Sequence, residues 1–301
     1  MPAEKMHPDE IDTDVHLVGR LLAAQFPQWA NLPIERVPSA GTDNALYRLG
    51  DDMVVRLPRI HWAGGGVDKD FRWLPLLASL LPLSIPVPVA KGTPAEGYPW
   101  GWGVYPWLEG ENPAVGRIPN PDSLASELAQ FVKALHRVDL AGGPPAGRGV
   151  PLAMRDEPTR TALAALHGMI DTDAVTAEWD AALEIPSWSG HPVWVHGDPA
   201  PGNLLLQGSR LTGVIDWGGL GVGDPACDLI VAWNLLPANV RNIFRAEMGV
   251  DDATWERGRG WALSVALIQL PYYKDTKPPA CGQRPPRYSR SPRRSGGGRA
   301  D

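Results

Sequence analysis

Apolar positions along the chain alternate between helical and strand-like spacing. Near the start, Val15, Val18, Leu21 and Leu22 recur at intervals of three and four, which predicts an amphipathic helix. Short β-like runs follow, and a Gly-Asp-Asp sequence at residues 50–52 predicts a tight turn between two of them. The predicted elements of this part are a helix, three strands, a helix, an extended Pro-rich run and a strand, over residues 11–26, 34–38, 45–49, 53–57, 67–81, 85–89 and 102–107.

The pattern becomes mainly helical after residue 109. Asn120-Pro121 is typical of a helix start, because Asn caps the first turn and Pro fits its geometry, and an apolar stripe follows to Leu135. Helices are predicted over 157–169 and 173–183, short strands at 193–195, 204–205 and 214–215, and mainly helix over 224–270. We expect an α+β protein, with a small β-rich N-terminal lobe over 1–109 and a larger helical C-terminal lobe over 110–274.

Composition and charge narrow the class of protein. Hydrophobic residues make up 44% of the 301 residues, enough for a sizeable core, and the net charge of −6 argues against nucleic acid as a partner. The two cysteines, Cys227 and Cys281, are far apart, which argues against a disulfide framework. With neither a signal-peptide pattern nor a long apolar run, the sequence predicts a cytoplasmic protein without a membrane partner. It does not indicate an oligomeric state.

The last residues, 275–301, differ from the rest. They are rich in Pro, Gly, Ser and Arg and have a net charge of +5, whereas the preceding residues have −11. Because they offer almost no apolar surface to bury, they are predicted to form a disordered basic tail.

The residues that suggest chemistry lie in two polar loops. Asp198 follows the apolar Val193–Val195 run, Asn203 comes five residues later, and Asp216 follows a predicted hairpin. Phosphoryl transfer requires a carboxylate that accepts or orients the proton of the nucleophile, and oxygen ligands for Mg²⁺. We therefore predict Asp198 as the catalytic base, and Asn203 and Asp216 as Mg²⁺ ligands.

This arrangement resembles the catalytic and metal-binding loops of the aminoglycoside phosphotransferase family, in the protein-kinase-like superfamily. The matching motifs occur in order: His196-Gly197-Asp198, Asn203 and Asp216-Trp217-Gly218. Gly197, where protein kinases have Arg, and the downstream residues 223–229 are similar to the small-molecule branch. The resemblance covers roughly residues 10–272. It implies a bilobal protein-kinase-like fold with ATP (GTP possible) and Mg²⁺ as cofactors.

The resemblance also implies a nucleotide site in the N-terminal lobe. Arg56 lies where the family has a Lys directed at the phosphates, and Asp70 where it has the Glu that pairs with that Lys. Trp107 lies in a stretch similar to the hinge that meets the nucleotide base, and small residues before the second strand match the hairpin over the phosphates. The predicted nucleotide contacts are Gly41, Thr42, Asn44, Arg56, Asp70 and Trp107.

Three further residues have two interpretations each. His196 is expected to support the catalytic loop rather than to transfer a proton. Asp224 and Asp228 either face a cationic acceptor or cap the following helix and hold the catalytic loop.

The function predicted from this resemblance is that of a small-molecule kinase with a hydroxyl acceptor. Aminoglycosides and macrolides are candidate acceptors, which would imply antibiotic resistance, and the sequence around Arg56 is similar to that of the macrolide group. Kinases of choline, homoserine or sugar derivatives belong to the same superfamily and remain alternatives. Arg56 and Asp70 also leave open a nucleotide-binding pseudoenzyme. A metal-dependent hydrolase using His196, Asp198 and Asp216 is disfavoured, because no second His cluster is recognisable.

Overall fold

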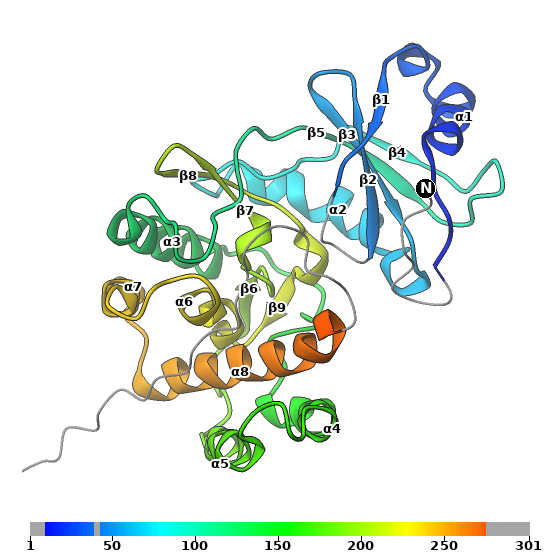
Figure 1. Ribbon diagram of the computed structural model, residues 1–301. Coiled ribbons are helices and arrows are strands. Elements are labelled where there is room, and N and C mark those ends of the chain that lie inside the picture. The colour runs from blue at the N-terminus through cyan, green and yellow to red at the C-terminus, as the bar shows by residue number, and fades with distance from the viewer. Residues whose placement is uncertain (1–9, 39–42, 275–301) are drawn as a thin grey trace, which may run out of the picture.

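A computed structural model describes residues 10–38 and 43–274 of the chain (Figure 1). Gly41, Thr42 and the expected basic tail at 275–301 lie outside these residues.

The N-terminal part is a five-stranded antiparallel sheet of order β1-β2-β3-β5-β4. The turn between β2 and β3 places Gly50 at φ 59°, a left-handed conformation that glycine adopts without strain. The helix predicted at the start is confirmed, and its buried residues pack against the sheet. The elements are α1 (Val15–Gln25), β1 (Ile34–Arg36), β2 (Asn44–Leu49), β3 (Met53–Pro58), α2 (Gly66–Ala78), β4 (Ala90–Gly92) and β5 (Trp102–Pro106).

The remaining part is mainly helical, as predicted, with two small two-stranded sheets, β6-β9 and β7-β8. Its helices are α3 (Pro121–His136), α4 (Asp156–Ala165), α5 (Thr172–Leu183), α6 (Val231–Asn234), α7 (Arg241–Met248) and α8 (Asp252–Lys274). Its strands are β6 (Val193–Val195), β7 (Leu204–Gln207), β8 (Arg210–Val214) and β9 (Gly221–Gly223). No helix among the described residues combines the length and the apolarity needed to span a bilayer.

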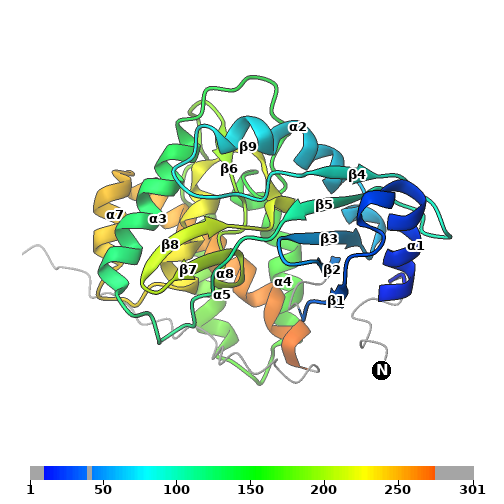
Figure 2. The same cartoon turned by 90° about the horizontal axis from the view of Figure 1, so that it is seen from above.

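The start of α3 follows the predicted capping. The Asn120 side chain accepts a hydrogen bond of 3.2 Å from the Ser123 amide, and Pro121 occupies the first turn. The apolar stripe of α3 is buried against α7, β6 and β8. In Figures 1 and 2, the β7-β8 hairpin lies beside α3, on the side facing the five-stranded sheet.

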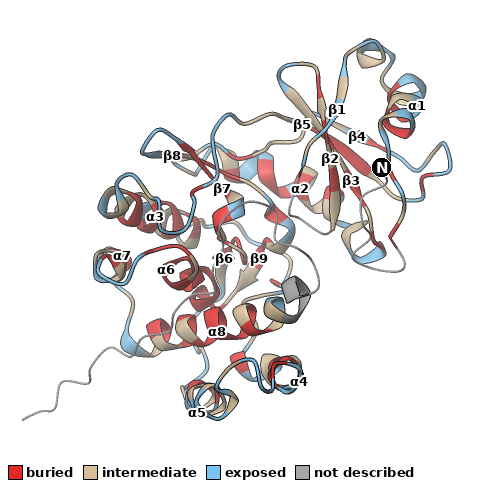
Figure 3. Ribbon diagram, viewed as in Figure 1, coloured by how far each residue is buried: buried red, intermediate tan, exposed pale blue. Residues whose placement is uncertain are grey.

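Two hydrophobic clusters form the core. One joins α1 to the five-stranded sheet, and the larger one includes α3, α6 and α8, where Figure 3 shows many of the buried residues. Trp73, Leu74 and Leu77 of α2 belong to the larger cluster. Ser84, after α2, exchanges backbone hydrogen bonds of 3.1 and 3.0 Å with Thr212 and Val214 of β8. The helix α2 therefore connects the sheet to the helical part, and the division expected at residue 109 stays a prediction.

Candidate active site

The loop between β6 and β7 contains Asp198 and fits closely against the segment after Asp216. Gly197 has φ 82°, and a Cβ built on it would lie 2.9 Å from the Gly219 carbonyl oxygen. A side chain at this position would be strained and would clash with backbone, which gives a physical reason for glycine where protein kinases have arginine.

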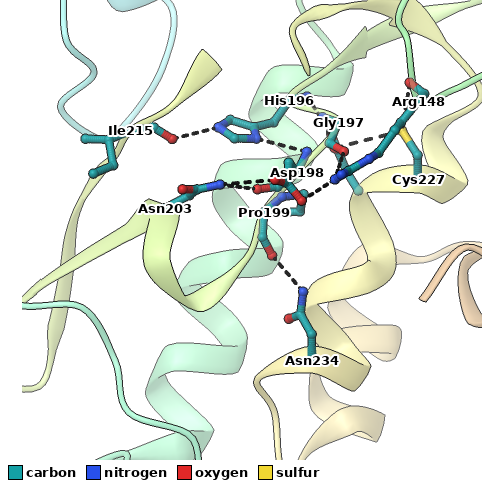
Figure 4. A network of polar contacts seen from close by, with 10 residues as sticks. Arg148, His196, Gly197, Asp198, Pro199, Asn203, Ile215, Cys227 and Asn234 are labelled. Carbon is teal, nitrogen blue, oxygen red and sulfur yellow. Dashed lines mark hydrogen bonds and ion pairs between the residues drawn. The ribbon is translucent and has the colours of Figure 1, made fainter. Parts of the chain in front are cut away.

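His196 connects the two loops. It is 1% exposed, and its Nδ1 accepts a hydrogen bond of 3.2 Å from the Asp198 amide. Because Nδ1 accepts, the proton is on Nε2, which donates to the Ile215 carbonyl at 3.1 Å (Figure 4). The ring therefore supports the residue before Asp216 and the backbone of Asp198 at the same time.

Asp228 holds the beginning of the same loop. It is fully buried, its Oδ1 accepts from the Gly197 amide at 2.8 Å, and its Oδ2 accepts from the His196 amide at 3.0 Å. His136 Nε2 of α3 lies 3.1 Å from Oδ2. Each of these groups needs a partner in the interior, so the Asp228 carboxylate serves the loop rather than an external ligand.

Asp224 is likewise engaged internally. It is 4% exposed, and its Oδ1 accepts from the Ala226 amide at 2.9 Å, which caps the Pro225–Ile230 turn. Its Oδ2 pairs at 2.8 Å with Arg257 of α8, a side chain that is also nearly fully buried. The geometry thus corresponds to the capping interpretation of Asp224.

Asp198 itself contacts two side chains. Asn203 Nδ2 donates to the Asp198 carbonyl at 2.8 Å and lies 3.5 Å from Oδ2. Arg148 forms an ion pair with Oδ1 and donates to the Gly197 carbonyl at 3.2 Å (Figure 4). Sequence reasoning missed Arg148, which precedes Asp198 by 50 residues in a Gly- and Pro-rich loop without periodic pattern.

The pairing of β7 with β8 brings the backbones of the two predicted metal ligands together, since Leu204 lies opposite Val214. The Ile215 amide donates to the Asn203 carbonyl at 2.8 Å, and Asp216 follows directly. Asp216 has φ 59° and ψ 71°. Besides Glu96 it is the one non-glycine residue with positive φ in the described part of the chain. Such a conformation costs about 1–3 kcal/mol, and Asp is among the residues that tolerate it best.

This arrangement suits a magnesium ion. The Asp216 carboxylate is 48% exposed, and the Asn203 amide, whose nitrogen faces Asp198, leaves its oxygen as the atom able to bind a cation. Carboxylate and amide oxygens are ligands that Mg²⁺ accepts, usually with several waters. Within the described ranges, no cluster of three or more His, Cys, Asp or Glu residues forms a metal site.

Arg56 joins β3, α2 and the Asp216 loop. Its Nη1 lies 2.8 Å from Asp70 Oδ2, and its Nη2 lies 3.5 Å from Asp216 Oδ1. Asp70 is 1% exposed and also accepts a hydrogen bond of 2.9 Å from the Tyr105 hydroxyl. Burial raises the pKa of the Asp70 carboxyl, and Arg56 opposes that shift. The Arg56 side chain, which is longer than Lys, therefore reaches the Asp70 side chain, which is shorter than Glu, and the two form the pair that the resemblance implies.

We expect substitutions of Arg56 and Asp70 to have coupled effects on the affinity for Mg-ATP, because the lengths of the two side chains are matched. Arg56→Lys should weaken Mg-ATP binding, because Lys lacks the fork that contacts both carboxylates. Asp70→Glu alone should crowd the buried site, whereas Arg56→Lys with Asp70→Glu should recover most of the affinity. Calorimetric titration of the four proteins would give a coupling energy of about 0.5–3 kcal/mol. Additive losses in the double variant would contradict the coupling.

A second link between α2 and the Asp216 loop involves Lys69. Its Nζ donates to the Gly218 carbonyl at 2.5 Å and to the Leu220 carbonyl at 3.2 Å. Burial lowers the pKa of Lys69, an effect that Asp70 opposes. The predicted site includes neither of these contacts, since carbonyl acceptors have no sequence signal.

The remaining predicted nucleotide contacts lie around the sheet. Asn44 begins β2 opposite Pro58 of β3, the strand that contains Arg56. Trp107 follows β5, its amide donates to the Asp52 carbonyl at 2.7 Å, and the Arg48 guanidinium stacks 4.0 Å from its ring centroid. Asn44 and Arg56 therefore lie on neighbouring strands.

The antiparallel sheet is joined to a helical part, and the loops of Asp198 and Asp216 lie between them. This arrangement defines the class of proteins with the bilobal kinase-like fold. The model of the Phosphotransferase enzyme family (APH) matches residues 35–261, and the chain belongs to this family. The "Uncharacterized protein YcbJ" of Bacillus subtilis (strain 168) is 28% identical over 159 residues. That match covers 50% of the chain and 48% of this relative, so it spans about half the length of each.

Solved structures with the same fold include antibiotic phosphotransferases. The GDP complex of aminoglycoside 2'-phosphotransferase-IIIa is similar with a TM-score of 0.72 and 21% identity, covering 87% of this chain and 94% of that one. Macrolide 2'-phosphotransferase MphH from Brachybacterium faecium has a TM-score of 0.61 and 23% identity, covering 86% and 92%. At these identities the likeness shows the fold, so the expected kinase-like architecture is confirmed.

Proposed function

We propose that this protein transfers the γ-phosphoryl group of ATP, or of GTP, to a hydroxyl of a small molecule. The observation that supports it most is the single network joining the loops of Asp198, Asn203 and Asp216. Membership in a phosphotransferase family and similarity to proteins solved with GDP, ADP and ATP agree with this reaction. A pseudoenzyme more often lacks one of these three side chains, and here all are present.

Each residue has a defined part in this proposal. Asp198 accepts the proton of the acceptor hydroxyl as its oxygen attacks the γ-phosphorus and the bond to the leaving nucleoside diphosphate breaks. Asn203 and Asp216 would hold Mg²⁺, which supplies charge neutralisation at the phosphates when bound. Arg56, oriented by Asp70, places a guanidinium beside the same ion site, where it can bind phosphate oxygens.

The charges near Asp198 favour an acceptor that is neutral or weakly cationic. A polycationic acceptor needs acidic partners, but the carboxylates of Asp224 and Asp228 are buried and bonded internally. Arg148 pairs with Asp198 and so neutralises the carboxylate that an ammonium group would otherwise meet there. We therefore place macrolides and small metabolic alcohols ahead of aminoglycosides as acceptors, in a cytoplasmic setting that stays a prediction.

An acceptor screen tests this proposal. Purified protein with Mg-ATP is expected to release ADP only when the correct hydroxyl compound is present, and a macrolide should support faster release than kanamycin. A coupled ADP assay over macrolides, aminoglycosides, choline, homoserine and sugar derivatives measures it, with GTP as a second donor.

Two outcomes would count against the proposal. Tight Mg-ATP binding without turnover over the whole panel would favour a nucleotide-binding pseudoenzyme. Release of phosphate from simple esters without nucleotide would favour a hydrolase. Faster turnover of kanamycin than of any neutral acceptor would contradict the charge argument alone.

A further inference from the structure

Arg148 contacts the loop of Asp198 at two points. Its Nη1 pairs with Asp198 Oδ1 and also donates to the Gly197 carbonyl at 3.2 Å (Figure 4). Both side chains are partly accessible, each 29% exposed. The second carboxylate oxygen, Oδ2, has only a marginal contact of 3.5 Å with Asn203 Nδ2. One oxygen of Asp198 is therefore held by a charged group, and the other is held weakly.

The backbone around Arg148 is fixed by its neighbours. The Ala146 amide donates to the Val222 carbonyl at 3.0 Å, and the Val222 amide donates to the Pro144 carbonyl at 2.8 Å. On the other side of Arg148, the Gly149 carbonyl accepts from the Asp224 amide at 2.8 Å. The loop is thus attached to β9 at Pro144 and Ala146, and to the start of the Pro225–Ile230 turn at Gly149.

Glycine permits this close attachment. Gly149 has φ 119°, and a Cβ built on it would lie 3.4 Å from the Gly223 Cα. The Gly223 Cβ position would in turn lie 2.5 Å from the Gly149 carbonyl oxygen. The two backbones approach too closely for side chains, so the position of Arg148 relative to Asp198 is set by packed main chain.

We propose that Arg148 is a positioning residue for Asp198. It holds Oδ1, so that the carboxylate presents Oδ2 to the hydroxyl of the acceptor. Because Nη1 also donates to the Gly197 carbonyl, the guanidinium meets Oδ1 from a fixed direction and limits rotation of the carboxylate more than solvent would. The catalytic role of this contact rests on the proposed phosphotransferase function, whereas the inference that Arg148 orients the Asp198 carboxylate does not.

In the reaction, the acceptor oxygen forms a bond to the γ-phosphorus while the bond from that phosphorus to the bridging oxygen breaks. The electron pair leaves with the nucleoside diphosphate, and the hydroxyl proton passes to Asp198 Oδ2. Arg148 transfers nothing in this step. A misplaced base lowers the rate of this step without weakening nucleotide binding.

The kinetic test compares Arg148→Met with Arg148→Lys. Met keeps much of the side-chain length but cannot donate, so kcat should fall about 10- to 100-fold with the KM for ATP changed by less than about twofold. Lys retains the charge without the planar guanidinium and should give an intermediate kcat. Arg160→Met is the matched control, because Arg160 pairs with Asp156 and Asp180 on the surface of α4 and α5. A kcat of Arg148→Met equal to that of the control would overturn the proposal.

A structural test needs no acceptor. Crystal structures of the wild type and of Arg148→Lys and Arg148→Met should show one Asp198 rotamer in the wild type, and a turned or divided side chain in Arg148→Met. An unchanged Asp198 rotamer without the guanidinium would overturn the proposal. If the wild type phosphorylates no acceptor, the proposed function fails, and this comparison still decides whether Arg148 orients Asp198.

Discussion

Replacing Asp198 with Asn is expected to lower kcat by about 10²- to 10⁴-fold, the range contributed by general acid–base groups. Asn keeps the shape of the side chain and its contact with Asn203, but it cannot take up a proton. Since Asp198 is not expected to bind the nucleotide, the affinity for Mg-ATP should stay nearly unchanged. Steady-state kinetics with the acceptor from the screen, together with calorimetric titration of Mg-ATP, measure both quantities.

Asp173→Asn serves as the control for this substitution. Asp173 is exposed in the first turn of α5, so removal of its charge should leave kcat unchanged. An Asp198→Asn protein that retains most of its turnover would show that another group accepts the proton. A parallel loss of Mg-ATP affinity would assign Asp198 to nucleotide binding instead.

Replacing Asp216 with Asn is expected to weaken Mg-ATP binding by about tenfold or more and to remove its dependence on Mg²⁺. The carboxylate is the charged oxygen ligand of the proposed ion site, and Mg²⁺ binds carboxylates more strongly than neutral amides. Asn tolerates the left-handed backbone of this position, so the change alters the ligand while sparing the conformation. Calorimetric titrations of ATP with Mg²⁺ and with a chelator would measure the effect.

The variant Asp216→Gly distinguishes the effect of losing the carboxylate ligand from the effect of the backbone conformation. Glycine relieves any strain at φ 59° and also removes the carboxylate, so it should lose Mg²⁺ dependence as Asn does. When a chelator removes Mg²⁺, both variants should bind ATP with about the same affinity as the wild type. Unchanged Mg²⁺ dependence in either variant would exclude Asp216 as the ligand.

The elements predicted best from the sequence are those with local signals. The apolar spacing from Val15 to Leu22 and the Asn120-Pro121 start specify helices through neighbouring residues. Both helices form, with ends shifted by a few residues. The strands β4 (Ala-Lys-Gly) and β9 (Gly-Val-Gly) were missed, because they consist mainly of residue types that are depleted in strands, whereas the equally short β6 is Val-Trp-Val.

Contacts between distant segments could not be predicted in the same way. The length match between Arg56 and Asp70 depends on how α2 lies over β3. Arg148 reaches Asp198 only because its loop pairs with β9, a strand that follows by about seventy residues. Asp228 appeared equally suited to an acceptor site or to the interior, and its burial beneath His196 and Gly197 depends on the tertiary fold.

Analysis of the reaction product tests the central claim most directly. Protein is incubated with ATP labelled at the γ-phosphate and with the acceptor that stimulates ADP release, and the label is followed by mass spectrometry and ³¹P NMR. The proposed function predicts one phosphate ester on an acceptor hydroxyl for each ADP formed, and none with Asp198→Asn. Label found only in inorganic phosphate, or an ester formed equally well by Asp198→Asn, would contradict it.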